Sequence, residues 1–216
     1  MTAQEKTVDG NDALGTSAER MFSDRREPVD ARVDASTALL KLKEGNLAYL
    51  EAKRNTGDIS PEMRADTCEN GQHPFAVVLT CADSRVVPEH MFMAGIGELF
   101  VIRVAGNVMG DTQMASVLYA VSHLGAKLVM VLGHTHCGAI EAAMSGEAHG
   151  CVRAVTDTIA AAIGDTTDDY AACVLNVRTA VNALCENGEM AEQMASGDVD
   201  VVGGVYHIDT GEVDFV

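Results

Sequence analysis

Two short, uninterrupted apolar runs most constrain what this chain can fold into. The first covers residues 75–81 (FAVVLTC) and the second covers residues 127–134 (KLVMVLGH), and both are rich in β-branched side chains. Such runs are typical of parallel strands buried on both faces, whereas a strand with one face in water alternates polar and apolar residues. The sequence therefore predicts a sheet covered by helices on both sides.

The segments around these runs predict how the sheet is connected. Residues 98–107 (ELFVIRVAGN) repeat the strand character, and residues 114–125 (MASVLYAVSHLG) read as a helix that ends at Gly125. Strand, helix and strand in this order indicate parallel crossovers. We expect an α/β fold with a mostly parallel sheet flanked by helices, and a C-terminal antiparallel edge strand from a hairpin in residues 198–216.

Helices are also expected before and after the sheet. Residues 34–54 carry apolar side chains at helical spacing and a candidate N-cap at Asp34. The apolar positions of that stretch are Ala38, Leu39, Leu42, Leu47 and Leu50. Residues 60–70 and 151–197 read as further helices, and residues 1–33 as a polar N-terminal arm ahead of one catalytic domain at 34–216.

Composition excludes several classes of partner. The chain has 216 residues, with 15 basic against 32 acidic side chains and a net charge of −17, which disfavours nucleic acids and anionic membranes. No apolar run is long enough to cross a bilayer, and the first thirty residues lack the apolar core of a signal peptide. We expect a cytoplasmic protein, in which the six cysteines serve as metal ligands or buried thiols rather than disulfides.

The ends of the two apolar runs carry residues that bind metals. Cys81 ends the first run, His134 ends the second, and Cys137 follows three residues later, where a helix can start. Residues three apart share a helical face, so His134 and Cys137 can converge while His136 points elsewhere. Two thiolates and one imidazole suit zinc. The alternative is that Cys81 is a small buried apolar residue and that the HxxC spacing arose by chance.

Three protein ligands leave a coordination position open, as in catalytic zinc sites. Asp83 and Arg85 follow Cys81 closely, and an aspartate paired with arginine stays ionised. The carboxylate can orient the nucleophile or occupy the open position itself. An ordinary salt bridge that caps the next helix is the alternative interpretation of this pair.

Four motifs between residue 34 and the C-terminus resemble the β-class carbonic anhydrases, zinc enzymes that interconvert carbon dioxide and bicarbonate. They are CADSRVVPE from residue 81, HTHC from residue 134, GELFVIRVAGN from residue 97 and YAVSHLG from residue 119. The resemblance implies that Cys81, His134 and Cys137 bind Zn²⁺. It also implies that Asp83 and Arg85 are a catalytic dyad, open when paired and closed when Asp83 coordinates zinc.

The resemblance extends to substrate and assembly. It assigns substrate hydrogen bonds to Gln72 and Gly138, an apolar substrate wall to Phe100, Ala105 and Tyr119, and proton transfer to His123 together with Tyr119. The implied partners are carbon dioxide, bicarbonate and further copies of the chain, as a homodimer or homotetramer with the cleft at the subunit boundary.

The chain departs from the family pattern at three positions. Val104 stands where an asparagine is usual, His136 stands where smaller residues are common, and Val78 stands where members with a non-catalytic bicarbonate site often carry tryptophan. Three other functions stay open: a carbonyl sulfide or carbon disulfide hydrolase on the same fold, a non-catalytic zinc-binding protein, and an interaction protein that uses the N-terminal arm.

Overall fold

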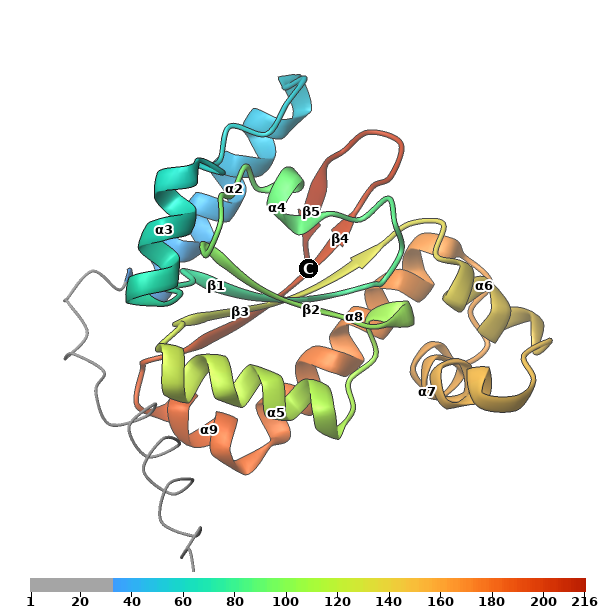
Figure 1. Cartoon of the computed structure of the whole chain (residues 1–216). Helices are drawn as coiled ribbons and strands as arrows, with labels where there is room; N and C mark the ends of the chain where they lie inside the picture. Colours follow the sequence, from blue (N-terminus) through green and yellow to red (C-terminus); the bar gives the residue numbers. More distant parts are fainter. Residues whose placement is uncertain (1–32) are drawn as a thin grey trace, which may run out of the picture. The chain divides into compact units, whose positions relative to one another are not determined.

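The computed structural model of the chain describes residues 33–216 (Figure 1). The arm expected at residues 1–33 falls almost entirely outside the described residues. Five strands form one sheet in the order β2-β1-β3-β4-β5, and all neighbours are parallel except β4 and β5. The strands are β1 (Ala76–Thr80), β2 (Leu99–Arg103), β3 (Leu128–His134), β4 (Asp200–Tyr206) and β5 (Val213–Phe215).

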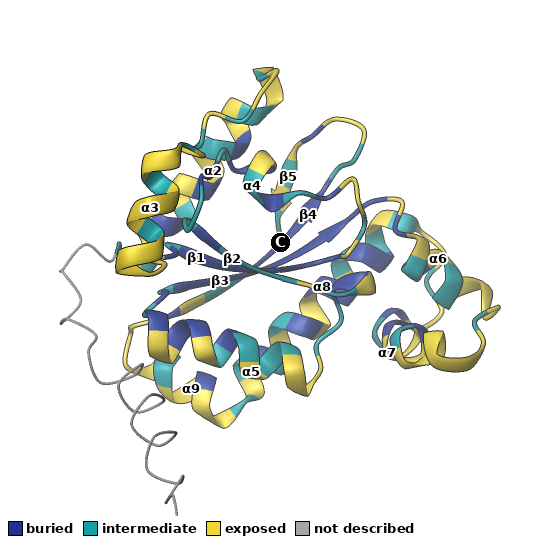
Figure 2. Cartoon of the chain, in the orientation of Figure 1, coloured by how far each residue is buried: buried dark blue, intermediate teal, exposed yellow. Residues whose placement is uncertain are grey.

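The expected fold class is confirmed, including the antiparallel edge strand, and the two apolar runs form the centre of the sheet. Every residue of β1 and of β3 is buried (Figure 2). Helices on both faces explain why neither strand alternates polar and apolar residues.

Helices cover both faces of the sheet (Figure 1). An apolar cluster on each face holds them to it. One cluster includes Val117, Ile159 and Val177, which come from the helices that follow β2 and β3. The other includes Leu42 and Met91, which come from helices on either side of β1 in the sequence. The helices are α2 (Ala35–Glu51), α3 (Pro61–Asn70), α4 (Pro88–Met91), α5 (Asp111–Tyr119), α6 (Gly138–Ser145), α7 (Arg153–Ile163), α8 (Asp169–Glu186) and α9 (Gly188–Ala195).

Helix α2 begins as expected but buries only part of its apolar stripe. The Asp34 carboxylate accepts a hydrogen bond from the Thr37 N–H, so Asp34 is the N-cap. Ala38 and Leu42 are buried, whereas Leu47 is 67% exposed and Leu50 is 39% exposed. The helical spacing was therefore correct, but it did not tell which turns of the helix reach the sheet.

The helix expected to end at Gly125 begins earlier and changes its pitch. It starts at Asp111, and after Tyr119 it continues as a π-helix over Ala120–Leu124. Gly125 ends it with a left-handed φ of 70°, a conformation that costs glycine little.

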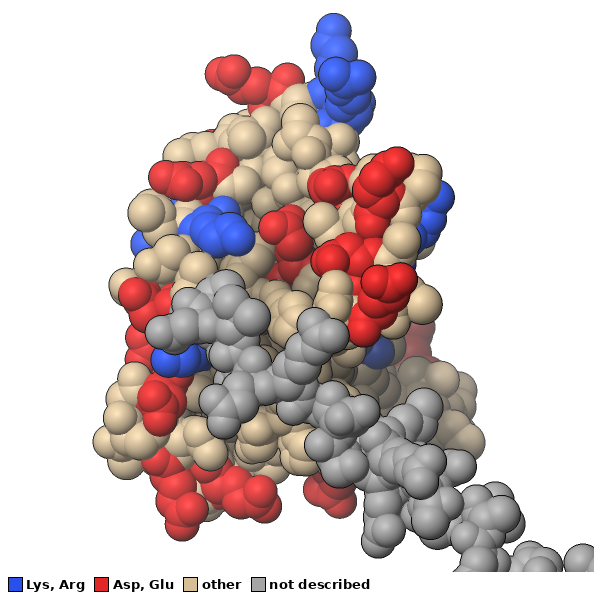
Figure 3. Space-filling view, turned by 60° about the vertical axis from the view of Figure 1, so that its left-hand side comes forward, with Lys and Arg blue, Asp and Glu red and all other residues tan. Residues whose placement is uncertain are grey.

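None of the helices in residues 33–216 is both long and apolar enough to span a membrane. Acidic side chains are spread over the face of the molecule shown in Figure 3, in keeping with the excess of acidic over basic residues in the sequence.

Candidate metal centre

The carboxyl ends of β1 and β3 bring Cys81, His134 and Cys137 together. These strands are parallel neighbours, with Thr80 opposite Leu132, so the residues that follow them meet at one edge of the sheet. Within residues 33–216, these three form the one group of possible metal ligands, and their ligand atoms lie within 4.8 Å of one another. All three side chains are at most 4% exposed, which leaves little water to solvate them.

The imidazole of His134 is oriented as a metal ligand would be. Its Nδ1 lies 2.9 Å from the Thr135 carbonyl oxygen, which can only accept, so Nδ1 carries the proton. Nε2 then presents its lone pair toward the two cysteines. In the described part of the chain this buried Nε2 has no hydrogen-bond partner. A buried polar atom without a partner is costly, and a metal ion would satisfy it.

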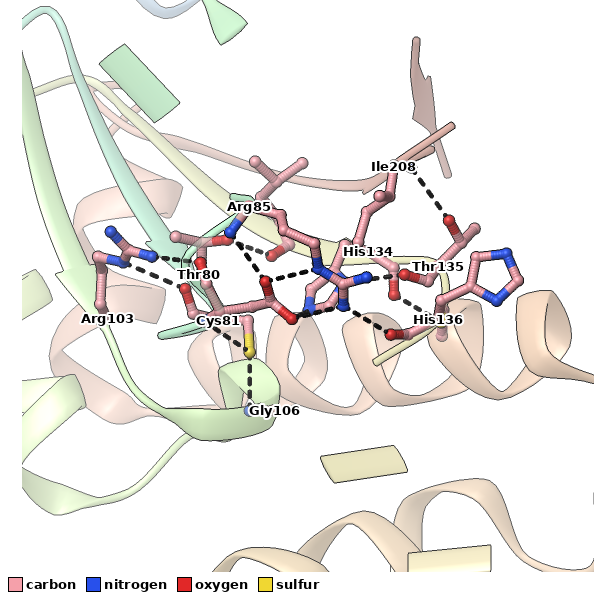
Figure 4. A network of polar contacts seen from close by, with 12 residues as sticks. Thr80, Cys81, Arg85, Arg103, Gly106, His134, Thr135, His136 and Ile208 are labelled. Atoms are coloured by element: carbon pink, nitrogen blue, oxygen red, sulfur yellow. Dashed lines mark hydrogen bonds and ion pairs between the residues drawn. The ribbon is translucent and has the colours of Figure 1, made fainter. Parts of the chain in front are cut away.

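The two thiols favour a cation between them. The pKa of Cys81 is lowered to about 4, first by the hydrogen bond from the Cys137 thiol. The pKa of Cys137 is raised well above its ordinary value, first because its thiol donates a hydrogen bond to Cys81, and also because it is buried and lies beside the Cys81 charge. Backbone N–H groups of Gly106 and Asp83 donate to the Cys81 sulfur at 3.2 and 3.4 Å and stabilise its charge (Figure 4). A divalent ion would remove the repulsion between the thiolates, so this donor set fits zinc.

Asp83 and Arg85 form a bidentate ion pair beside the cluster. Arg85 donates from Nε and Nη2 to the two carboxylate oxygens at 3.0 and 2.7 Å, and from its backbone N–H at 2.9 Å. These contacts lower the pKa of Asp83 to about 2, with the Arg85 side chain as the largest cause. Asp83 Oδ2 lies 4.0 Å from His134 Nε2, so an ionised carboxylate faces the metal ligands. Among residues 33–216 no side chain caps α4, which begins after Val87, so the alternative role of the pair as a helix cap is wrong.

Arg103 was missed by the sequence reasoning. It donates from Nε to the Cys81 carbonyl at 3.2 Å and from Nη2 to the Asp83 carbonyl at 2.6 Å, and so holds the loop that carries both residues (Figure 4). An arginine at the end of a strand gives no local signal of this role. Its partners Cys81 and Asp83 are 22 and 20 positions away in the chain, and only the pairing of β1 with β2 brings them near.

Two of the departures from the family pattern have a clear structural setting. The side chain of His136 is 70% exposed, which confirms that it points away from the ligands. Val104 packs against the apolar core, and its backbone bonds to Thr80 and Ala82, so it extends the β1–β2 pairing. The backbone N–H and the carbonyl of Val104 are therefore both hydrogen-bonded.

The other residues expected at the site fall into two groups. Ala105 and Gly138 are close to the ligands in the chain, next to Gly106 and Cys137, and both are exposed. Gln72 instead precedes the amino end of β1, and Phe100 lies opposite Val77, four residues before Cys81. At about 3.3 Å per residue, Phe100 is roughly 13 Å along the sheet from the metal ligands.

Tyr119 and His123 belong with Phe100 rather than with the metal ligands. The Tyr119 ring stacks on His123 with centroids 5.1 Å apart, and its centroid lies 6.2 Å from that of Phe100. One chain therefore does not bring these aromatic residues or Gln72 to its own metal centre.

The fold and the donor set together define a class of protein. A Cys₂His cluster at the carboxyl edge of a parallel sheet, beside an ionised Asp–Arg pair, is a three-ligand site of the catalytic zinc type.

Comparison with known proteins agrees with that class. A family model described as carbonic anhydrase matches residues 76–213. Carbonic anhydrase 2 of Mycobacterium tuberculosis is 32% identical over 182 residues, which cover 79% of this chain and 87% of that protein.

Two solved structures are also similar. The β-carbonic anhydrase CafA of Aspergillus fumigatus has a TM-score of 0.65 and 26% identity, with 84% of this chain and 89% of that chain covered. The β-carbonic anhydrase of Coccomyxa, solved with acetazolamide, has a TM-score of 0.61 and 29% identity, with 74% and 87% covered. The chain belongs to the β-class carbonic anhydrase family. It is accordingly a zinc enzyme whose reaction is the hydration of carbon dioxide.

Proposed function

We propose that Asp83 and Arg85 are the catalytic dyad of this hydration and that Cys81, His134 and Cys137 hold the zinc. The observation that carries the proposal is the bidentate pair that keeps an ionised carboxylate 4.0 Å from Nε2 of His134. Zinc, when bound, supplies an activated water near neutral pH. The part of Asp83 is to accept a hydrogen bond from the nucleophile and so orient it toward the carbon atom of the substrate.

Arg85 keeps Asp83 in that orientation. Its Nη2 donates to Asp83 and also, at 3.0 Å, to the His136 carbonyl oxygen, so the guanidinium is fixed from two sides (Figure 4). A carboxylate held this way cannot turn toward the metal ligands. Loss of the arginine would leave Asp83 free to take the open position.

Gly138 offers a donor for the substrate. It is the first residue of α6, so its N–H makes no hydrogen bond within the helix. A Cβ built on Gly138 would meet no atom of residues 33–216 within 4 Å, so this part of the chain lets a small molecule approach the backbone there. A fixed N–H at this point would stabilise negative charge that develops on a carbon dioxide oxygen. Ala105, next to the Gly106 that donates to Cys81, would be part of the apolar wall.

Gln72, Phe100, Tyr119 and His123 are proposed to serve the metal centre of a second copy. Their position toward the amino ends of β1 and β2 supports this role, because they are remote from the ligands of their own chain. A homodimer or homotetramer with the cleft at the subunit boundary would bring the two sets together. A reducing, cytoplasmic location belongs to the proposal, because the six cysteines of the chain are free thiols.

The proposed activity has a direct test. The chain purified under reducing conditions should contain about one zinc per subunit and hydrate carbon dioxide, as followed by stopped-flow with a pH indicator. A chelator should abolish the reaction, and added zinc should restore it. Carbonyl sulfide and carbon disulfide are assayed with the same preparation. Full zinc content without hydration of carbon dioxide would contradict the proposal and favour one of the other functions.

The shared site predicts complementation between two inactive variants. Gln72→Ala and Arg85→Ala should each lose most activity, the first by about 100-fold because a donor to the developing charge is lost. Exchange of subunits between them produces mixed dimers with one intact and one doubly altered site. Half of the dimers are mixed, and one of the two sites in each mixed dimer is intact. Activity should then rise to about a quarter of the wild-type rate. No gain after demonstrated exchange would mean that Gln72 acts within its own chain or not at all.

A further inference from the structure

Helix α8 carries polar residues on a face that packs against the sheet. Asp169, Cys173 and Asn176 are spaced by four and three residues, so they lie on one side of the helix. Cys173 is fully buried and Asn176 is 3% exposed. Buried amides and thiols need partners, and the partners of these side chains show what this face contacts.

All three side chains bond to backbone atoms at or beside the metal ligands: His134, His136 in the loop after β3, and Gly106 in the turn after β2. Asn176 Nδ2 donates to the Gly106 carbonyl at 2.8 Å, and the Cys173 thiol donates to the His134 carbonyl at 2.9 Å. Asp169 Oδ2 accepts from the His136 N–H at 2.9 Å. Since the Gly106 N–H donates to the Cys81 sulfur, α8 is linked to Cys81 through Gly106, as well as directly to His134.

Glycines in the sheet let α8 approach closely enough for these short side chains to reach. A Cβ on Gly133 would lie 2.6 Å from Cγ2 of Val177, and a Cβ on Gly203 would lie 2.9 Å from Cγ1 of the same valine. Such distances are not tolerated, so any larger residue would push the helix away. The close approach of α8 therefore depends on glycines of β3 and β4.

The contact from Asp169 fixes an unfavourable conformation. His136 has a φ of 55°, in the left-handed region that most residues with a Cβ avoid. Its N–H is held by Asp169 and its carbonyl accepts from Arg85 Nη2 at 3.0 Å. A chain of contacts thus runs from α8 through the His136 peptide to the arginine that orients Asp83.

We propose that Asp169, Cys173 and Asn176 are positioning residues, through which α8 sets the Gly106 turn and the loop after β3 relative to each other and aims the His136 carbonyl at Arg85. The proposal rests on the metal site and dyad described above. It assigns a role in the reaction to a helix that has no residue among the ligands or the dyad.

The test at Asp169 uses the zinc-loaded enzyme and a conservative variant. Asp169→Ala should lower kcat about tenfold with little change in zinc content, the size expected when an outer partner of a metal site is lost. Asp169→Asn keeps an accepting oxygen and should retain most of kcat. His136→Gly, placed in the Asp169→Ala chain, should recover much of the loss, because glycine adopts a left-handed φ without strain.

The test at the buried positions uses metal release and a spectroscopic signature. Cys173→Ala and Asn176→Ala should release zinc to a chelator about tenfold faster and should change the thiolate-to-cobalt absorption of the cobalt-substituted enzyme. Cys173→Ser keeps a donor and should resemble the wild type. Leu184→Ala is the matched control, a buried residue of α8 that should lower the melting temperature without changing release or spectrum.

The results separate this inference from the proposed function. A wild-type chain without zinc or hydration activity would contradict the proposed function. Unchanged kcat in Asp169→Ala, failure of His136→Gly to recover any loss, or equal zinc release from Cys173→Ala and Leu184→Ala would each overturn the positioning role while the metal site stands.

Discussion

Arg85→Ala is expected to keep its zinc and to lose carbon dioxide hydration by about 100-fold or more, the scale of a positioned acid–base group. The side chain is the largest cause of the low pKa of Asp83, and it holds both carboxylate oxygens. Without it, Asp83 can turn toward the ligand cluster, 4.0 Å away. Stopped-flow hydration rates and zinc analysis of the same preparation provide the measurement.

The pH dependence of the hydration rate of Arg85→Ala shows whether the Asp83 carboxylate has lost its position or its charge. Arg85 lowers the pKa of Asp83 from 3.8 to about 2, so its removal returns that pKa toward the ordinary value. Asp83 therefore stays ionised near neutrality in both proteins. A higher pH should not rescue Arg85→Ala by ionising Asp83.

The control is Arg153→Ala, which breaks an exposed Arg–Asp pair with Asp157 on α7 and should leave the rate unchanged. Wild-type rates for Arg85→Ala would show that Asp83 and Arg85 form an ordinary ion pair without a catalytic role.

His134→Ala is expected to abolish zinc binding and activity together, whereas His136→Ala should keep the metal. His134 is fully buried and lies in one ligand group with the two cysteines, while the side chain of His136 is 70% exposed and only its backbone bonds to residues at the site. Removal of one of three protein ligands leaves too few donors for a stable tetrahedral site. Zinc per chain, measured by atomic absorption after dialysis against a weak chelator, distinguishes the two variants.

A zinc-free His136→Ala protein, or a fully loaded His134→Ala protein, would show that His136 and not His134 is the metal ligand. Cys81→Ser provides a further check, because it replaces a thiolate by a hydroxyl of similar size. It should also lose zinc. Circular dichroism of each variant confirms that the fold survives, since the sheet keeps its apolar core around these positions.

Local patterns were sufficient to predict the framework of the fold. The runs at residues 75–81 and 127–134 are apolar throughout because both faces of β1 and β3 are covered, and that property can be read from composition alone. Helical spacing likewise predicted α2, but not its contacts. Leu47 and Leu50 continue the apolar stripe yet remain exposed, and helical spacing alone does not show which turns of α2 pack against the rest of the fold.

The identity of the metal ligands could also be predicted, because their geometry is nearly local. Cys81 and His134 end strands that are parallel neighbours, and Cys137 is three positions beyond His134 at the start of a helix. The carboxyl ends of parallel strands meet at one edge, so two local features are enough to bring three ligands together.

The support of the ligands was decided only by tertiary structure. Asp169, Cys173 and Asn176 bond to atoms 33, 39 and 70 positions away in the chain, and they reach them only because α8 packs closely over glycines of β3 and β4. The same holds for Gln72 and Phe100, whose distance from the metal ligands depends on the direction of the strands. Sequence by itself determined which residues can bind zinc, because strand ends and helical spacing are short-range properties. Tertiary structure decided what holds those residues in place, because hydrogen bonds between distant segments depend on how closely the segments can pack.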